Sequence, residues 1–165
     1  MAASTSVAAS AASRSKPSPI FTSAWLLLLL IAALTVLSSL FDLVADARTG
    51  LPSDHLGAFQ SLAGVIWSTA QQQAPGITQY ITRLEIAYAV HELVYGILFL
   101  LILAIPFRRG ARWAWWACWA VLLANLTYTF TFGTHDSTIL LESIAFDVLI
   151  PVLLLVNIPW FFGRQ

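Results

Sequence analysis

Four long apolar runs constrain this chain more than any other feature of its sequence. The first contains AWLLLLLIAALTVL, and each run reaches the roughly 20 residues that a helix needs to cross a bilayer. In lipid, backbone amides must pair within a helix or a closed barrel, and these runs lack the alternation of barrel strands. We therefore expect an all-α integral membrane protein, an antiparallel four-helix bundle. Its transmembrane domain should cover 19–163, with spans at about 21–44, 82–107, 112–132 and 138–162.

Composition supports a membrane protein of one domain. Of the 165 residues, 59% are hydrophobic and only 10% are charged, whereas a soluble domain has about 25% charged residues. The formal net charge is zero, so nothing indicates a nucleic-acid partner. Cys118 is the only cysteine and cannot form an intramolecular disulfide.

Basic and aromatic residues predict the orientation. In a four-span chain, Arg14, Lys16, Arg108, Arg109, Arg112 and Arg164 all fall on one side of the membrane. Only Arg48 and Arg83 fall on the other side, and five tryptophans lie near the basic side. Cytoplasmic segments are enriched in Lys and Arg, and indoles favour the headgroup level. Both patterns predict that the N-terminus and the C-terminus are cytoplasmic.

The segments outside the spans are an N-terminal tail and one long loop. Residues 1–18 are rich in Ala and Ser, and we expect a disordered tail. In the loop at 45–81, Leu56, Phe59, Leu62 and Ile66 recur at helical spacing. This pattern predicts a short amphipathic helix on the membrane surface or over the mouth of the bundle. A packed loop without a function is the alternative.

Acidic and polar side chains interrupt the apolar spans. Glu85, Tyr88, Glu92 and Tyr95 follow offsets of three, four and three residues, which places them on one helical face. With a rise of about 1.5 Å per residue, Glu92 lies roughly 15 Å below the non-cytoplasmic end. Asn125 and Tyr128 on the third span, Asp147 on the fourth and Asp42 on the first occupy the same half of the bundle.

These groups predict an intramembrane cavity. A charge at mid-bilayer costs about 2.5–3.5 kcal/mol, so the acids should face inward, where they are protonated, hydrogen-bonded or reached by water. The expected ligand-binding set is Asp42, Glu85, Tyr88, Glu92, Tyr95, Asn125, Tyr128 and Asp147. Alternatively, Asp42 and Glu85 reach interfacial water, the tyrosine hydroxyls serve helix packing, and His91 bonds to a neighbouring helix.

Four short motifs resemble the EXPERA family, which includes the emopamil-binding sterol isomerase and the sigma-two receptor. They are LFDL (40–43), ELVYG (92–96), FRRGARW (107–113) and LIPVLLL (149–155), in that order. The resemblance implies a pocket for sterol-like or cationic amphiphilic ligands, with Asp42 facing the ligand and Glu92 supporting it. The isomerase places a His and a Glu one helical turn apart, whereas His91 and Glu92 are adjacent here. The chain also resembles DoxX-like proteins and uncharacterised bacterial four-helix proteins.

Several functions fit these observations. The first is a binder of a membrane lipid or a sterol-like small molecule. The second is an isomerase that moves a ring double bond, with Glu92, His91, Glu142 and Asp147 as candidate catalytic residues. A proton-coupled carrier and a structural membrane subunit are the other two.

We expect no cofactor and no metal site, because His91 and Glu92 are adjacent rather than four residues apart. A second copy of the chain or another membrane protein remains open as a partner. The expected location is the endoplasmic reticulum in a eukaryote and otherwise the plasma membrane.

Overall fold

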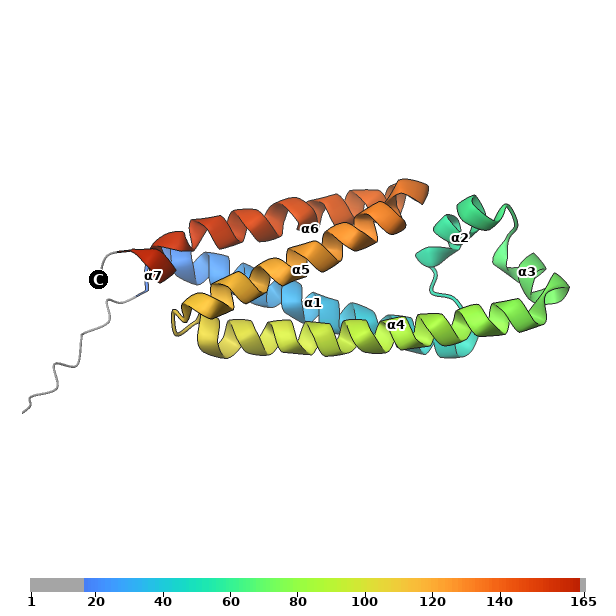
Figure 1. Cartoon of the computed structure of the whole chain (residues 1–165), viewed down its shortest axis with the longest axis horizontal. Helices are drawn as coiled ribbons and strands as arrows, with labels where there is room; N and C mark the ends of the chain where they lie inside the picture. The colour runs from blue at the N-terminus through green and yellow to red at the C-terminus, as the bar shows by residue number, and fades with distance from the viewer. Residues whose placement is uncertain (1–16, 164–165) are drawn as a thin grey trace, which may run out of the picture.

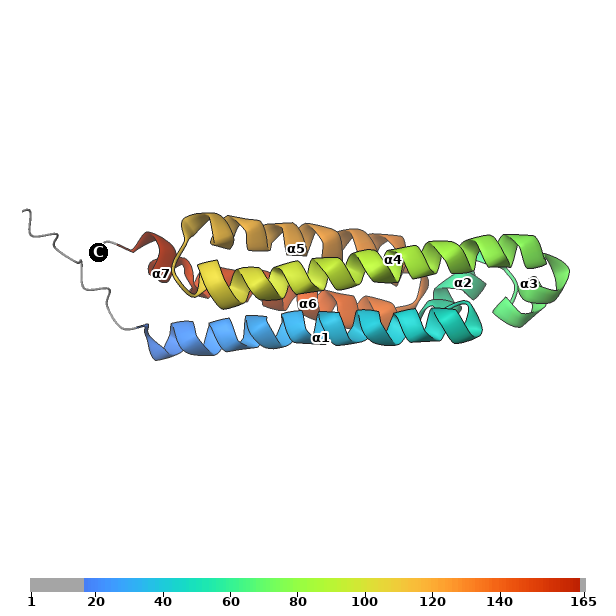
Figure 2. The same ribbon diagram turned by 90° about the horizontal axis from the view of Figure 1, so that it is seen from below.

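The computed structural model describes residues 17–163, and every regular element in that range is a helix. The expectation of an all-helical chain is therefore confirmed for these residues. Four long helices alternate in direction along one axis (Figures 1 and 2): α1 (Pro19–Thr49), α4 (Pro75–Ile102), α5 (Arg112–Thr131) and α6 (Ser137–Val156). Most of the expected tail at 1–18, and the basic residues Arg14, Lys16 and Arg164, lie outside the described residues.

Three helical segments are long and apolar enough to cross a membrane. They are Pro19–Thr49, Pro75–Phe107 and Ser137–Phe162. The remaining long helix, α5, has 20 residues, and four tryptophans, Asn125 and three threonines make it less apolar than the others. Four spans were expected. Three of them are helices that could cross a membrane by length and composition, and α5 is not among these three.

The four helices form two pairs. α1 packs along α4 and α5 packs along α6, while α1 also contacts α6. The main apolar core lies at the end of the bundle that carries Arg108 and Arg112. Its fully or almost fully buried residues include Leu28, Phe99, Leu103, Phe107, Cys118 and Leu154. The bundle is therefore closed by side chains at its basic end.

Two tryptophans connect helices within this core. Pro106 interrupts the end of α4, which continues as a π-helical turn, η1 (Leu103–Phe107). The indole of Trp25 donates a hydrogen bond to the Leu103 carbonyl at 2.9 Å. The indole of Trp115 donates to the Leu154 carbonyl, also at 2.9 Å, just before Asn157 separates α6 from α7 (Ile158–Phe162). Indoles thus satisfy carbonyls where the helices are irregular.

Small residues allow α1 and α4 to approach closely. Ala32, Ser39 and Asp46 are buried on α1 at seven-residue spacing, and Ala89 and Gly96 are buried on α4 at the same spacing. A Cβ at Gly96 would lie 3.3 Å from the backbone nitrogen of Val36. This is the close backbone contact that small residues permit between membrane helices.

The long loop folds into two short helices, α2 (His55–Ala63) and α3 (Trp67–Gln73). The expectation of a single amphipathic helix reaching Ile66 is wrong, because Gly64 adopts a left-handed conformation (φ 71°) that ends α2. α2 lies at the end of the bundle opposite the core and contacts the 3₁₀ turn η2 (Gly133–His135) (Figure 1).

Candidate functional site

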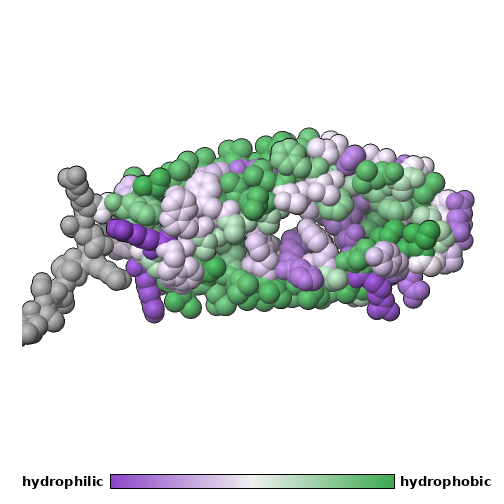
Figure 3. Space-filling view, viewed as in Figure 1, coloured by the Kyte–Doolittle hydropathy of each residue, from purple (hydrophilic) through white to green (hydrophobic). Residues whose placement is uncertain are grey.

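A cavity of about 400 Å³ opens between the two helix pairs, between the apolar core and α2. The space-filling view is hollowed there, with hydrophilic residues bordering the hollow and hydrophobic residues covering the helices around it (Figure 3). All four long helices contribute to its wall, together with Asp54 and His55 at the start of α2. Ligand pockets commonly have volumes of 300–1,000 Å³, so the cavity is large enough for a small molecule.

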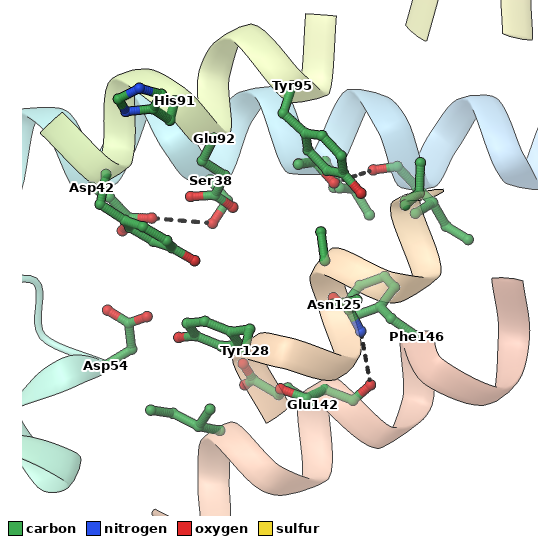
Figure 4. Close-up of a pocket in the computed structure, with 18 of the residues that line it drawn as sticks. Ser38, Asp42, Asp54, His91, Glu92, Tyr95, Asn125, Tyr128, Glu142 and Phe146 are labelled. Atoms are coloured by element: carbon green, nitrogen blue, oxygen red, sulfur yellow. Dashed lines mark hydrogen bonds between the residues drawn. The ribbon is translucent and has the colours of Figure 1, made fainter. Parts of the chain in front are cut away.

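Most of the expected site residues line this cavity (Figure 4). They are Asp42, Tyr88, Glu92, Tyr95, Asn125 and Tyr128, together with the candidate catalytic residues His91 and Glu142. The structure therefore brings together side chains that lie far apart in the sequence. Binding of a ligand by these residues stays a prediction.

The cavity is acidic and has apolar walls. Four carboxylates line it: Asp42 on α1, Asp54 before α2, Glu92 on α4 and Glu142 on α6. Ile31, Leu34, Val121, Ile139 and Phe146 supply the apolar surface. None of the described residues that line it is a lysine or an arginine. A head group that carries positive charge or hydrogen-bond donors would therefore find acceptors without a competing lysine or arginine.

Tyr95 offers a further polar group to the cavity. Its hydroxyl is buried and has no hydrogen-bond partner among the described residues. A buried hydroxyl without a partner carries a desolvation cost that a bound ligand or water can relieve.

Asp147 was expected to line the cavity, but it lies behind the cavity wall. Its carboxylate accepts hydrogen bonds from Asn125 Nδ2 at 2.7 Å and from Thr129 Oγ1 at 2.8 Å. The α5–α6 interface thus satisfies this acid. Its structural effect is to orient the amide of Asn125, which itself lines the cavity.

Glu85 is also absent from the wall of the main cavity. Its Oε2 lies 3.0 Å from Nδ1 of His55, and Nε2 of the same imidazole lies 3.0 Å from the hydroxyl of Tyr128. Glu85 on α4, His55 on α2 and Tyr128 on α5 thus form one hydrogen-bonded chain. The side chain of His55 is 7% exposed.

Sequence reasoning did not identify His55 as a site residue, because a single histidine in a loop follows no periodic pattern. Burial lowers the pKa of His55, but the hydrogen bond to Glu85 and the charges of Asp54, Glu85 and Asp42 together raise it above its ordinary value. Only the tertiary structure shows that this loop residue joins α4 and α5.

His55 also lines a second cavity of about 270 Å³. The second cavity lies between α2 and the start of α4, and Leu51, Phe59, Leu62 and Ile81 form most of its apolar lining. Glu85 and His55 are its polar residues.

His91 lies at the exposed side of α4. Its Nδ1 is 2.6 Å from the carbonyl oxygen of Ala87 in the same helix, so Nδ1 carries the hydrogen. Nε2 is then the basic nitrogen of the neutral ring. One expectation from the sequence was that His91 bonds to a neighbouring helix. The structure shows instead a contact of His91 within its own helix.

Within residues 17–163, no group of three or more His, Cys, Asp or Glu side chains is arranged to hold a metal ion. Comparison of the chain with protein-family models, curated proteins and solved structures gave no match. The resemblance to the EXPERA family therefore stays a prediction, and the candidate site rests on its geometry.

Proposed function

We propose that the chain is a four-span membrane protein whose cavity binds an amphiphilic small molecule, either sterol-like or cationic. In this proposal α5 is the fourth span, since its 20 residues reach about 30 Å as a helix and it packs along α6. The arginine-rich turn between α4 and α5 faces the cytoplasm, and the cavity opens in the other half of the bilayer.

One observation carries the proposal: acids from separate helices meet in a cavity with apolar walls. Asp42, Glu92 and Glu142 line it together, and Asn125 is held toward it by Asp147. Membrane helices rarely carry acids unless the acids have a function, because each one is costly in lipid. An amphiphile would place its polar head among the acids and its apolar body against the walls and the surrounding acyl chains.

Binding of a radiolabelled sterol and of a radiolabelled amphiphilic amine to purified protein in detergent tests this proposal. We expect Asp42→Asn and Glu92→Gln each to weaken binding of the amine by about tenfold or more, because each removes a charged acceptor. Sterol binding should weaken less, because a neutral hydroxyl forms weaker hydrogen bonds.

Arg83→Gln is the matched control. Arg83 is an exposed charged residue on α4 outside the cavity lining, and its substitution changes the net charge by one. It should leave sterol binding unchanged. Equal binding of both probes to wild type, Asp42→Asn and Glu92→Gln would reject the assigned site.

A double-bond isomerase is a second candidate function, and the contact of His91 favours it. The hydrogen on Nδ1 leaves Nε2 as a base, and Glu92 beside it could act as the acid. Incubation with an unsaturated sterol in heavy water measures this activity. Deuterium in the recovered sterol, lost in His91→Gln, would support it, and no incorporation would argue against proton transfer.

The proton-coupled carrier has less support. The core between the cavity and the basic end consists mainly of apolar side chains, and Asn157 is the buried polar residue among them. A proton relay needs successive polar groups or water. A pH-dependent flux in proteoliposomes that Asp147→Asn abolishes would favour the carrier.

A further inference from the structure

We infer that His55 controls which kind of hydrogen bond Tyr128 offers to a ligand in the cavity. A neutral His55 makes Tyr128 an acceptor for the ligand, and a protonated His55 makes it a donor. This inference rests on the proposed function, because it specifies the head group that the same cavity selects.

The geometry places His55 between two partners of different chemistry. Nδ1 is 3.0 Å from the Glu85 carboxylate and Nε2 is 3.0 Å from the Tyr128 hydroxyl. An ionised Glu85 can only accept, so the hydrogen of the neutral ring lies on Nδ1. Nε2 then carries a lone pair, and it accepts the hydrogen of Tyr128.

Protonation reverses the second of these bonds. In the neutral state the Tyr128 hydrogen points to Nε2, and only the oxygen lone pairs remain for a ligand. When His55 takes up a proton from solvent at Nε2, this nitrogen donates to the Tyr128 oxygen. The Tyr128 O–H is then free to rotate toward the cavity and donate to a ligand carbonyl or ether.

Charged and titratable groups around His55 favour uptake of this proton. Besides Glu85, Asp54 lies 3.9 Å from Nε2, and Asp42 adds a further negative charge. The groups that contact His55 or act on it through their charge are Asp42 and Asp46 on α1, Asp54 before α2, Glu85, Tyr88 and Glu92 on α4, and Tyr128 on α5. His135 and Asp136 lie at η2, and the same helices also carry the cations Arg48 on α1 and Arg83 on α4. The Asp136 carboxylate accepts from the amides of Thr138 and Ile139 at the start of α6.

The first test reads the hydrogen positions without any ligand. Protein labelled with ¹⁵N-histidine is titrated in micelles, and the His55 signals are assigned with His91→Gln and His135→Gln. We expect the Nδ1–H tautomer at high pH in wild type, and a mixture of tautomers in Glu85→Gln. An Nε2–H tautomer in the wild type would overturn the inference whether or not a ligand binds.

The second test measures the head-group preference with cholestanol and cholestanone. These steroids differ only in a hydroxyl against a carbonyl, and neither ionises, so pH acts through the protein alone. We expect affinity for the ketone relative to the alcohol to rise by about three- to tenfold as His55 becomes protonated, the value of one hydrogen bond.

His55→Gln and Tyr128→Phe should remove this pH dependence, while Tyr80→Phe keeps it because Tyr80 is exposed on α4 outside the cavity lining. A preference that is flat with pH in the wild type would overturn the inference even if both steroids bind. If neither steroid binds at any pH, the sterol proposal fails, and the tautomer measurement still decides the role of His55.

Discussion

Among the described residues, Asp46 has no partner that compensates its burial. It is 2% exposed on α1, and neither carboxylate oxygen has a hydrogen-bond partner among the described residues. An isolated buried charge destabilises the fold because it loses its hydration and gains nothing in return.

Replacing Asp46 should therefore stabilise the protein. We expect Asp46→Ala to raise the free energy of unfolding by about 1–3 kcal/mol, measured by reversible unfolding in mixed micelles. Asp46→Asn keeps a buried polar group without the charge, so its gain should be smaller. A loss of stability in Asp46→Ala would indicate that a bound ion or water compensates this carboxylate.

Asp147 shows the opposite situation, since both of its carboxylate oxygens accept a hydrogen bond across the α5–α6 interface. Thr129→Val removes one donor and leaves the shape nearly unchanged. We expect it to lower the free energy of unfolding by about 1–3 kcal/mol in the same assay. The matched control is Thr131→Val, because Thr131 is exposed and bonds only to its own helix. Equal effects of the two substitutions would mean that the Asp147 bond contributes nothing.

At the scale of helices, close packing of α1 on α4 depends on Gly96. A Cβ there would lie 3.1 Å from Val36 Cγ2 and 3.3 Å from the Val36 backbone nitrogen, so the helices would have to separate by a few tenths of an ångström. We expect Gly96→Ala to destabilise the bundle by about 1–3 kcal/mol, measured by unfolding in micelles.

Gly76→Ala, in the first turn of α4, provides the control for this substitution. A Cβ at Gly76 would meet no atom within 4 Å, so this change should be neutral or stabilise by up to about 1 kcal/mol. Equal stability of the two variants would show that α1 and α4 do not pack tightly at Gly96.

Docking of α2 on the bundle should depend on pH through His55. Because its folded-state pKa is raised, the stabilisation is fully present below its unfolded pKa of about 6.5 and is lost as pH rises through the higher folded value. We expect the melting temperature in micelles to fall across this window in the wild type and to fall less in Glu85→Gln.

His135→Gln, which removes an exposed histidine, should retain the pH dependence of the wild type. A melting temperature that rises between pH 6.5 and 8 in the wild type would contradict the expected sign. Such a rise would mean that His55 docks in its neutral form.

At the scale of the whole molecule, the asymmetry of basic residues predicts how the bundle crosses the membrane. Cys118 is the only cysteine of the sequence, and it is fully buried. Cys118→Ala therefore gives a background without thiols for labelling. We expect Ser53→Cys to react with an impermeant maleimide added to intact cells. Arg109→Cys should react only after permeabilisation. Reaction of Arg109→Cys alone in intact cells would reverse the proposed orientation.

Much of the architecture could be predicted from the sequence because membrane helices depend on local composition. The predicted third span at 112–132 matches α5 (Arg112–Thr131) within one residue, since the Arg–Arg–Gly turn and the apolar run mark both ends. The helix of the predicted second span, α4, begins at Pro75, well before the predicted residue 82. Its first turns lie beyond the apolar run, where hydropathy gives no signal.

The sequence by itself determined the four long helices and in which half of the bundle the acids lie, because helical periodicity and span length depend only on neighbouring residues. Only the tertiary structure decided which of these acids share a cavity. Asp42, Glu92 and Glu142 line it, whereas Asp147 bonds to Asn125 and Glu85 bonds to His55. The physical reason is that a buried acid takes whichever donor the neighbouring helix brings within reach, and that donor is set by helix packing.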